Sequence, residues 1–187
     1  MQRDSWSNQV KLAMSEIDSA MNVITETDIA SAVNEILNAK RIACYAGGRE
    51  GLMMKALTMR LFHAGLDVHV VGDMTTPHLG KGDLLILSCG PGNISTVEAL
   101  AGVAIKSGAR ILYFTAQPGN PPAKHANVIV KIPAQTMADD AASTAVLPMG
   151  STYEIALLIL ADLLTNAVRN SRGEAVEAMR DRHTNLE

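Results

Sequence analysis

The sequence predicts an α/β fold, a three-layer α/β/α sandwich with a five-stranded parallel sheet between two layers of helices. Short apolar runs alternate with helical segments of about ten to fifteen residues, and parallel strands need crossover connections of this kind. Two of these runs end in glycine-containing loops that open a helix, at 46–51 and 89–96. A chain of 187 residues with 48% hydrophobic residues can bury a full core, and we expect residues 1–187 to form a single domain.

The elements follow in order from the spacing of the apolar residues. An amphipathic helix is predicted over 8–21, and a second helix, capped by Thr27 or Asp28, runs to Lys40. Short apolar runs after it are typical of buried parallel strands. The predicted strands cover 41–46, 67–72, 83–88, 110–115 and 128–132, and the helices between them cover 51–64 and 93–107.

The last part of the chain holds a long loop, an apolar helix and a tail. The loop over 133–150 has a length that is typical of functional or mobile segments. The helix over 151–168 is apolar nearly all round, so it lies at the centre of the fold or against another subunit, and we expect a homo-oligomer. The chain thus divides into N-terminal helices (8–39), an α/β core (41–168) and a tail (171–187) with a weakly amphipathic helix.

Charge and composition favour a small-molecule ligand. The net charge of −3 and the pI near 5.9 provide no basic field for nucleic acid or for an acidic membrane surface. The first residues lack the apolar core of a signal peptide, so we expect a cytoplasmic protein. Cys44 and Cys89 fit buried thiols in a reducing compartment. His63 and His69 are separated by a turn, and no Cys/His spacing typical of a metal site occurs.

The two loops predict a ligand site. They read Ala-Gly-Gly-Arg-Glu-Gly over 46–51 and Cys-Gly-Pro-Gly-Asn-Ile-Ser-Thr over 89–96. Glycine lets the backbone approach a bound molecule, and the N–H groups at a helix start attract anions such as a sugar phosphate. Both loops follow the carboxyl ends of strands, where open α/β sheets bind ligands. The candidate binding residues are Gly47, Gly48, Arg49, Cys89, Gly90, Gly92, Asn93, Ser95 and Thr96.

Glu154 is the carboxylate that we single out for catalysis. In the first turn of an apolar helix, burial would raise its pKa and equip it to move a proton. Alternatively, it only complements the helix dipole. Arg49 could bind a phosphate or hydroxyl oxygen through its guanidinium group, or it could pair with Glu50 at the surface.

Four further side chains have both a functional and a structural interpretation. Ser95 and Thr96 could bind substrate or could cap their helix. His63 falls at a helix end, where histidine often binds free carbonyl groups. His183 lies near the C-terminus, where chains fray, unless it docks elsewhere, for example on a neighbouring subunit.

Several of these segments resemble the sugar isomerase (SIS) family. The resemblance covers roughly residues 41–187, and the glycine loops, Thr76-Pro77 and Pro148 to Glu154 belong to it. Two narrower motifs, Met-Arg-Leu-Phe-His-Ala-Gly over 59–65 and Arg-His-Thr-Asn-Leu-Glu over 182–187, resemble the 6-phospho-3-hexuloisomerases. The resemblance implies a flavodoxin-like α/β fold, a dimer or tetramer, and an isomerisation that uses no cofactor and no metal.

In that family pattern the substrate is a 3-keto hexose 6-phosphate and the product is fructose 6-phosphate. The resemblance implies that Glu154 is the general base that moves a proton between adjacent carbons through an enediol. It implies that His183, from a neighbouring subunit, assists proton transfer to oxygen or ring opening, and that His63 belongs to the same catalytic set. Arg49 would hold the substrate, and the second loop would take the phosphate.

The chain departs from the family at both loops. The second loop reads Cys-Gly-Pro-Gly-Asn-Ile over 89–94 where the family commonly has Ser-Gly-Ser-Gly-Glu-Thr, and Pro91 removes a backbone N–H. Glu50 stands where the family usually has serine. Its carboxylate would place a negative charge where phosphate oxygens would approach. Two like charges about 4 Å apart repel by roughly 4 kcal/mol at an effective dielectric constant of about 20, which disfavours phosphate binding. The alternative is therefore a SIS-type sugar or sugar-phosphate binding protein with an altered ligand or without catalysis.

Overall fold

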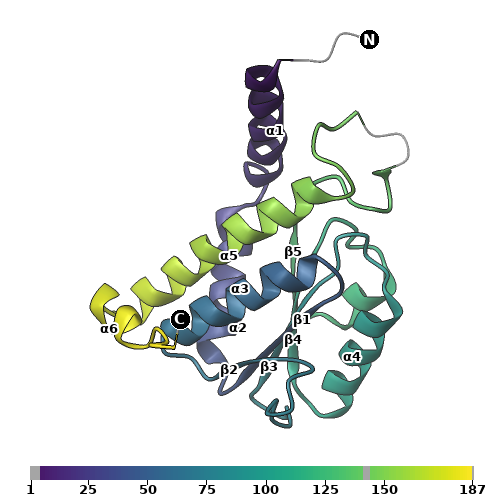
Figure 1. Ribbon diagram of the computed structural model, residues 1–187. Helices are drawn as coiled ribbons and strands as arrows, with labels where there is room; N and C mark the ends of the chain where they lie inside the picture. The colour runs from purple at the N-terminus through teal and green to yellow at the C-terminus, as the bar shows by residue number, and fades with distance from the viewer. Residues whose placement is uncertain (1–4, 141–143, 187) are drawn as a thin grey trace.

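The computed structural model describes residues 5–140 and 144–186. Five strands form one parallel sheet in the order β2-β1-β3-β4-β5 (Figure 1). The strands are β1 (Ile42–Ala46), β2 (Val68–Val70), β3 (Leu84–Ser88), β4 (Arg110–Thr115) and β5 (Val128–Lys131). Helices lie on both faces of this sheet, so the predicted α/β/α class and all five predicted strands are confirmed.

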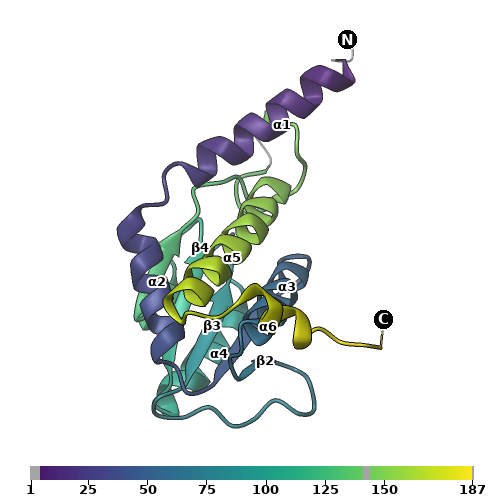
Figure 2. The same ribbon diagram turned by 90° about the vertical axis from the view of Figure 1, so that its left-hand side faces the viewer.

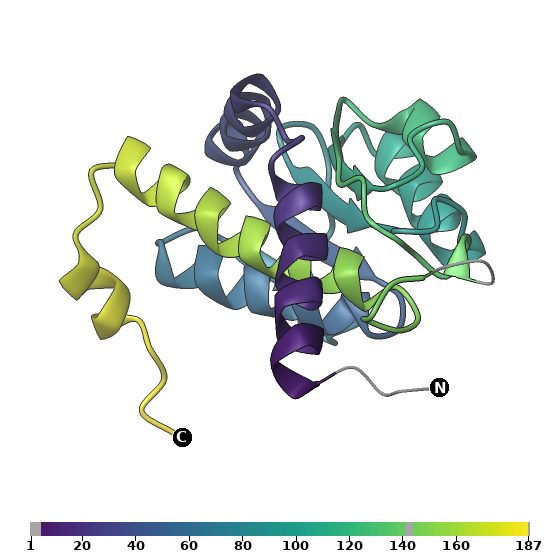
Figure 3. The same cartoon turned by 90° about the horizontal axis from the view of Figure 1, so that it is seen from above.

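The strand order creates a switch point between β1 and β3. From β1 the chain passes through α3 (Glu50–His63) to the edge strand β2, whereas from β3 it passes through α4 (Ser95–Lys106) toward the other edge. The two helices lie on opposite faces of the sheet (Figure 3). Open α/β sheets bind ligands in the crevice that such a reversal leaves at the carboxyl ends of the strands.

One face of the sheet carries the larger core. It is covered by α2 (Glu26–Asn38), α3 and α5 (Ser151–Ser171), and α3 and α5 lie side by side along their length (Figure 1). The other face is covered by α4 and the 3₁₀ segment η1 (Pro121–His125). By length and composition α5 could cross a membrane, but most of it is buried in this core. This burial agrees with the first of the two locations expected for the apolar helix, the centre of the fold.

The two ends of the chain differ in how they pack. The C-terminal half of helix α1 (Trp6–Met21) contacts α5, whereas the N-terminal end of α1 projects away from the body of the protein (Figure 2). Helix α6 (Val176–Asp181), shorter than the tail over which a helix was expected, packs against α3.

Helix α2 is capped by Thr25 rather than by Thr27 or Asp28. The Thr25 hydroxyl accepts from the Asp28 N–H, and the Asp28 carboxylate accepts from the Thr25 N–H.

Gly51 sets how closely α3 can approach the end of β1. A Cβ atom at this position would lie 2.8 Å from the carbonyl oxygen of Ala46. We expect Gly51→Ala to lower the free energy of unfolding by about 1–3 kcal/mol, because backbone atoms must shift to relieve the overlap. Urea unfolding followed by circular dichroism measures this change.

Gly102 provides the matched control. It lies inside α4, and a Cβ atom there would meet nothing within 4 Å. Gly102→Ala should therefore raise the free energy of unfolding by about 0.5–1 kcal/mol through helix propensity alone. Equal effects of the two substitutions would show that close packing at Gly51 is unimportant.

Candidate active site

A cavity of about 340 Å³ lies at the carboxyl ends of β1 and β3. The first loop supplies one wall through Gly47, Gly48, Arg49 and Glu50, and the second loop reaches the cavity through Pro91 and Ile94. The first turn of α5 adds Tyr153 and Glu154. The cavity therefore occupies the switch point of the sheet and joins the first loop to the carboxylate chosen from the sequence.

Glu154 points into this cavity and is only 8% exposed. Its Oε2 atom lies 2.9 Å from Nη1 of Arg49, and this same nitrogen donates a hydrogen bond to Ser151 Oγ at 2.7 Å. Within the described residues Oε2 accepts no aligned hydrogen bond, so its contact with Arg49 is an ion pair. Burial raises the pKa of Glu154, and the Arg49 guanidinium offsets part of that rise. A raised pKa makes this carboxylate a stronger base for taking a proton from a ligand.

Glu50 lies beside Glu154 in the cavity wall and turns inward, away from Arg49. Its carboxylate accepts hydrogen bonds from the Ser88 hydroxyl at 2.8 Å and from the Gly90 N–H, which is 3.0 Å from both oxygens. Burial raises its pKa, Ser88 and Gly90 lower it, and the nearby Glu154 charge raises it further. The expected alternative of an Arg49–Glu50 surface pair is therefore wrong, because Arg49 pairs with Glu154.

The long loop over 133–150 closes another side of the cavity through Thr136, Met137, Met149 and Gly150. Met149 has φ of 55°, in the left-handed region that side chains rarely adopt, and Gly150 follows with φ of 81°. Helix α1 supports this region, because Glu16 accepts hydrogen bonds from the Val146 N–H and the Thr152 hydroxyl. Part of the loop, 141–143, lies outside the described residues.

The remaining candidates of the second loop lie behind or outside the cavity lining. Cys89 is fully buried, and its thiol pKa is raised to about 11, chiefly by burial. The Gly90 N–H donates to the carboxylate of Glu50, and a Cβ atom at this position would lie 2.9 Å from the ring of Tyr153. Gly92 is buried with φ of 82°. The exposed side chains are Asn93, Ser95 and Thr96.

His63 and His183 lie together, far from Glu154 of the same chain. Their ring centroids are 5.1 Å apart. Together with Arg60 and Arg180 they line a second cavity of about 370 Å³, and we call these four residues the basic cluster. His63 ends α3, whereas Glu50 begins it, and a helix of 14 residues is about 20 Å long.

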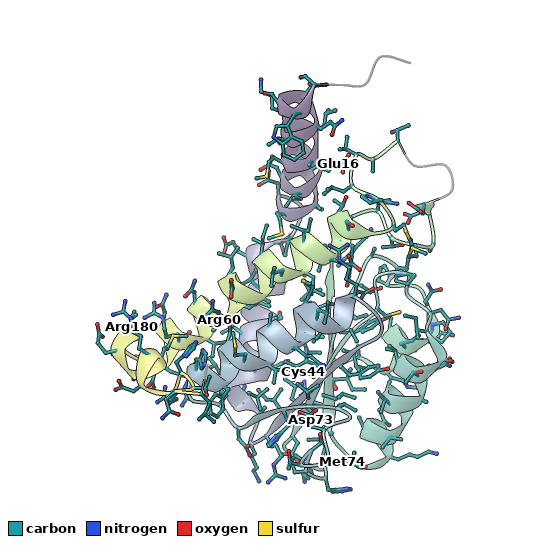
Figure 4. The ribbon with its side chains drawn as sticks, in the orientation of Figure 1. Glu16, Cys44, Arg60, Asp73, Met74 and Arg180 are labelled. Carbon is teal, nitrogen blue, oxygen red and sulfur yellow. The ribbon has the colours of Figure 1, made fainter. Side chains whose placement is uncertain are left out.

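The tail that carries His183 is docked. The Arg182 guanidinium donates to the carbonyl oxygen of His63 at 2.8 Å and to Glu174 at 2.6 Å. Figure 4 shows Arg60 and Arg180 together at the α6 end of the molecule and Glu16 at the opposite end, on α1.

Sequence reasoning missed several residues of the site. Ser88 and Tyr153 form a hydrogen bond of 3.0 Å between their hydroxyl groups, next to Glu50. Ser88 is the last residue of an apolar strand, and no local signal distinguishes it; Tyr153 is marked only by preceding Glu154. In the described part of the chain no group of three His, Cys, Asp or Glu side chains is arranged to hold a metal ion.

Comparison with known proteins places this geometry in a family. The sequence model of the SIS domain matches residues 35–159. A "3-hexulose-6-phosphate isomerase" of Mycobacterium gastri is 33% identical over 98% of this chain and 92% of its own length, and one of Bacillus subtilis is 30% identical over 93% and 95%. A crystal structure of a Methanococcus jannaschii protein, described as inferring a function of 3-hexulose-6-phosphate isomerase, is 27% identical, covers 96% of this chain and 99% of its own and superposes with a TM-score of 0.84. The chain therefore belongs to the SIS domain family.

Proposed function

We propose that this protein is a sugar-phosphate isomerase that interconverts 3-hexulose 6-phosphate and fructose 6-phosphate. The observation that carries the proposal is the desolvated carboxylate of Glu154 in a cavity at the sheet switch point. Curated relatives named for this activity match over nearly the full chain, which supports an isomerase.

Glu154 is the proposed general base. It takes the proton from C2 of the 3-keto sugar, and the electron pair of the C2–H bond forms the C2=C3 bond of an enediol while the C3 oxygen gains a proton. It then returns a proton to C3, the C2 hydroxyl loses its proton, and the 2-keto sugar results without net gain or loss of protons. Arg49 supports this role because its contact with Glu154 holds the carboxylate at the cavity wall.

The proton exchange between the two oxygens needs a second group, and we assign it to His183 and His63 of a neighbouring subunit. Helices α3 and α5 both begin beside the cavity, and along their length they expose apolar side chains, among them Phe62 at 51% and Leu163 at 54%. A second copy covers such a face by packing the same surface against itself about a two-fold axis. If the two subunits pack with these helices antiparallel, the basic cluster of one subunit lies at the cavity of the other.

The direct test is turnover by the purified protein. Incubation with 3-hexulose 6-phosphate should yield fructose 6-phosphate, followed by NMR, and in heavy water the product should carry deuterium at C3. Deuterium enters the product because the proton held by Glu154 exchanges with the solvent before it is returned to C3. No conversion under conditions in which the protein is folded would end the proposal.

The alternative function, a sugar or sugar-phosphate binding protein with altered ligand or no catalysis, is favoured by one observation. Glu50 occupies the Gly90 N–H of the loop that takes phosphate in the family pattern. A thermal-shift screen of sugar phosphates and neutral sugars separates the two functions, because a ligand stabilises the state that it binds. Stabilisation without turnover would support the binding protein.

A further inference from the structure

The backbone donors in the first half of the second loop, residues 89–92, are already used within the chain. The Cys89 N–H donates to the Phe114 carbonyl, and the Gly92 N–H donates to the Cys89 carbonyl. Pro91 has no N–H, and the Gly90 N–H donates to the Glu50 carboxylate. Residues 89–92 therefore offer no unused backbone N–H to a ligand.

The Glu50 carboxylate is held firmly in this position. It is 9% exposed, and beyond the Gly90 contact it accepts a bond from the Ser88 hydroxyl, which lies 3.0 Å from the Tyr153 hydroxyl. A Cβ atom at Gly90 would lie 3.1 Å from Glu50 Oε1 and 2.9 Å from the Tyr153 ring, so the loop and the carboxylate are in close contact. This is the arrangement expected of an anion bound on a glycine loop, with the anion supplied by the chain.

The charges around the cavity also disfavour an anionic ligand group at Gly90. Among the described lining residues the acids are Glu50 and Glu154, and the only cation is Arg49. Nη1 of that arginine already contacts Glu154 and Ser151. A phosphate dianion at Gly90 would face the Glu50 carboxylate at close range without a compensating cation on the loop.

We propose that Glu50 is a specificity-determining residue that fills the anion position of the second loop, so that the sugar presents a hydroxyl group there and its phosphate binds elsewhere. This inference deepens the proposed function and rests on it for the nature of the ligand. The carboxylate retains lone pairs that can accept a hydrogen bond from a sugar hydroxyl.

The test titrates sulfate, which stays dianionic near neutral pH, against the whole protein by calorimetry. Glu50→Ser removes the charge and frees the Gly90 N–H, and Glu50→Gln removes the charge while keeping the volume. We expect the dissociation constant for sulfate to fall at least about ten-fold in Glu50→Ser and by a smaller factor in Glu50→Gln, relative to the unaltered protein. Circular dichroism verifies that each variant is folded, and Glu50→Gln keeps the test open if Glu50→Ser does not fold.

Glu98→Ser is the matched control. Glu98 is exposed in the first turn of α4, so its loss removes a negative charge near the same helix start without freeing Gly90. Sulfate binding by this variant should equal that of the unaltered protein. Equal sulfate affinity in all four proteins, or an equal gain in Glu98→Ser and Glu50→Ser, would overturn the inference.

The outcome is separable from that of the proposed function because sulfate binding needs no turnover. An active isomerase whose sulfate affinity does not respond to Glu50 would refute the role of Glu50 alone. An inactive protein in which Glu50→Ser gains sulfate binding would refute the isomerase and leave the assignment of the loop intact.

Discussion

Glu154→Gln should lower kcat for the isomerisation by about 10²–10⁴-fold, the range that a positioned general base contributes. The amide keeps the size of the side chain but cannot accept a proton from C2. KM should change little, because the shape of the cavity is preserved. Steady-state kinetics, together with incorporation of deuterium at C3 of the product in heavy water, measure both effects.

The control separates catalysis from helix stabilisation. Glu26 is an exposed acid in the first turn of α2, on another helix, so Glu26→Gln removes the same favourable contact with a helix dipole. Each substitution should change the free energy of unfolding by no more than about 1 kcal/mol through the dipole. A Glu154→Gln protein with normal kcat would return Glu154 to the structural role that its position also allows.

Mixing of two inactive variants should restore activity if the site is shared between subunits. Glu154→Gln lacks the base but keeps the basic cluster, whereas His183→Ala keeps the base and lacks part of the cluster. In a two-fold dimer each mixed pair contains one site with both groups intact. Random association of equal amounts makes about half of the dimers mixed, so about one quarter of the original activity should return.

His63 supplies the control for this experiment. Its ring lies 5.1 Å from that of His183, so both belong to the same half of the proposed site. His63→Ala should therefore recover activity when mixed with Glu154→Gln and should not recover it when mixed with His183→Ala. The variants are unfolded and refolded together, and activity is compared with each variant refolded alone. Absence of recovery in the first mixture would show that the histidines do not complete a neighbour's site.

The sequence by itself determined the strands, the class of the fold and the position of the first loop in the site. These depend on local patterns, because a buried parallel strand must be a short apolar run and a loop that turns tightly into a helix needs glycine. The same local reasoning identified Glu154, since an acid in the first turn of an apolar helix is conspicuous. This reasoning could not decide whether Glu154 only complements the helix dipole or acts as a catalytic base, because both roles require an acid at the same position.

The tertiary structure alone decided which groups meet. Arg49 and Glu50 are neighbours in sequence, yet one reaches α5 and the other reaches the second loop, because successive residues at the start of a helix point in different directions. The contact of Arg182 with the end of α3, 119 residues away, likewise docks the tail and brings His183 to His63. Partners that are distant along the chain leave no periodic signal in it, so their choice depends on how helices and loops pack around the sheet.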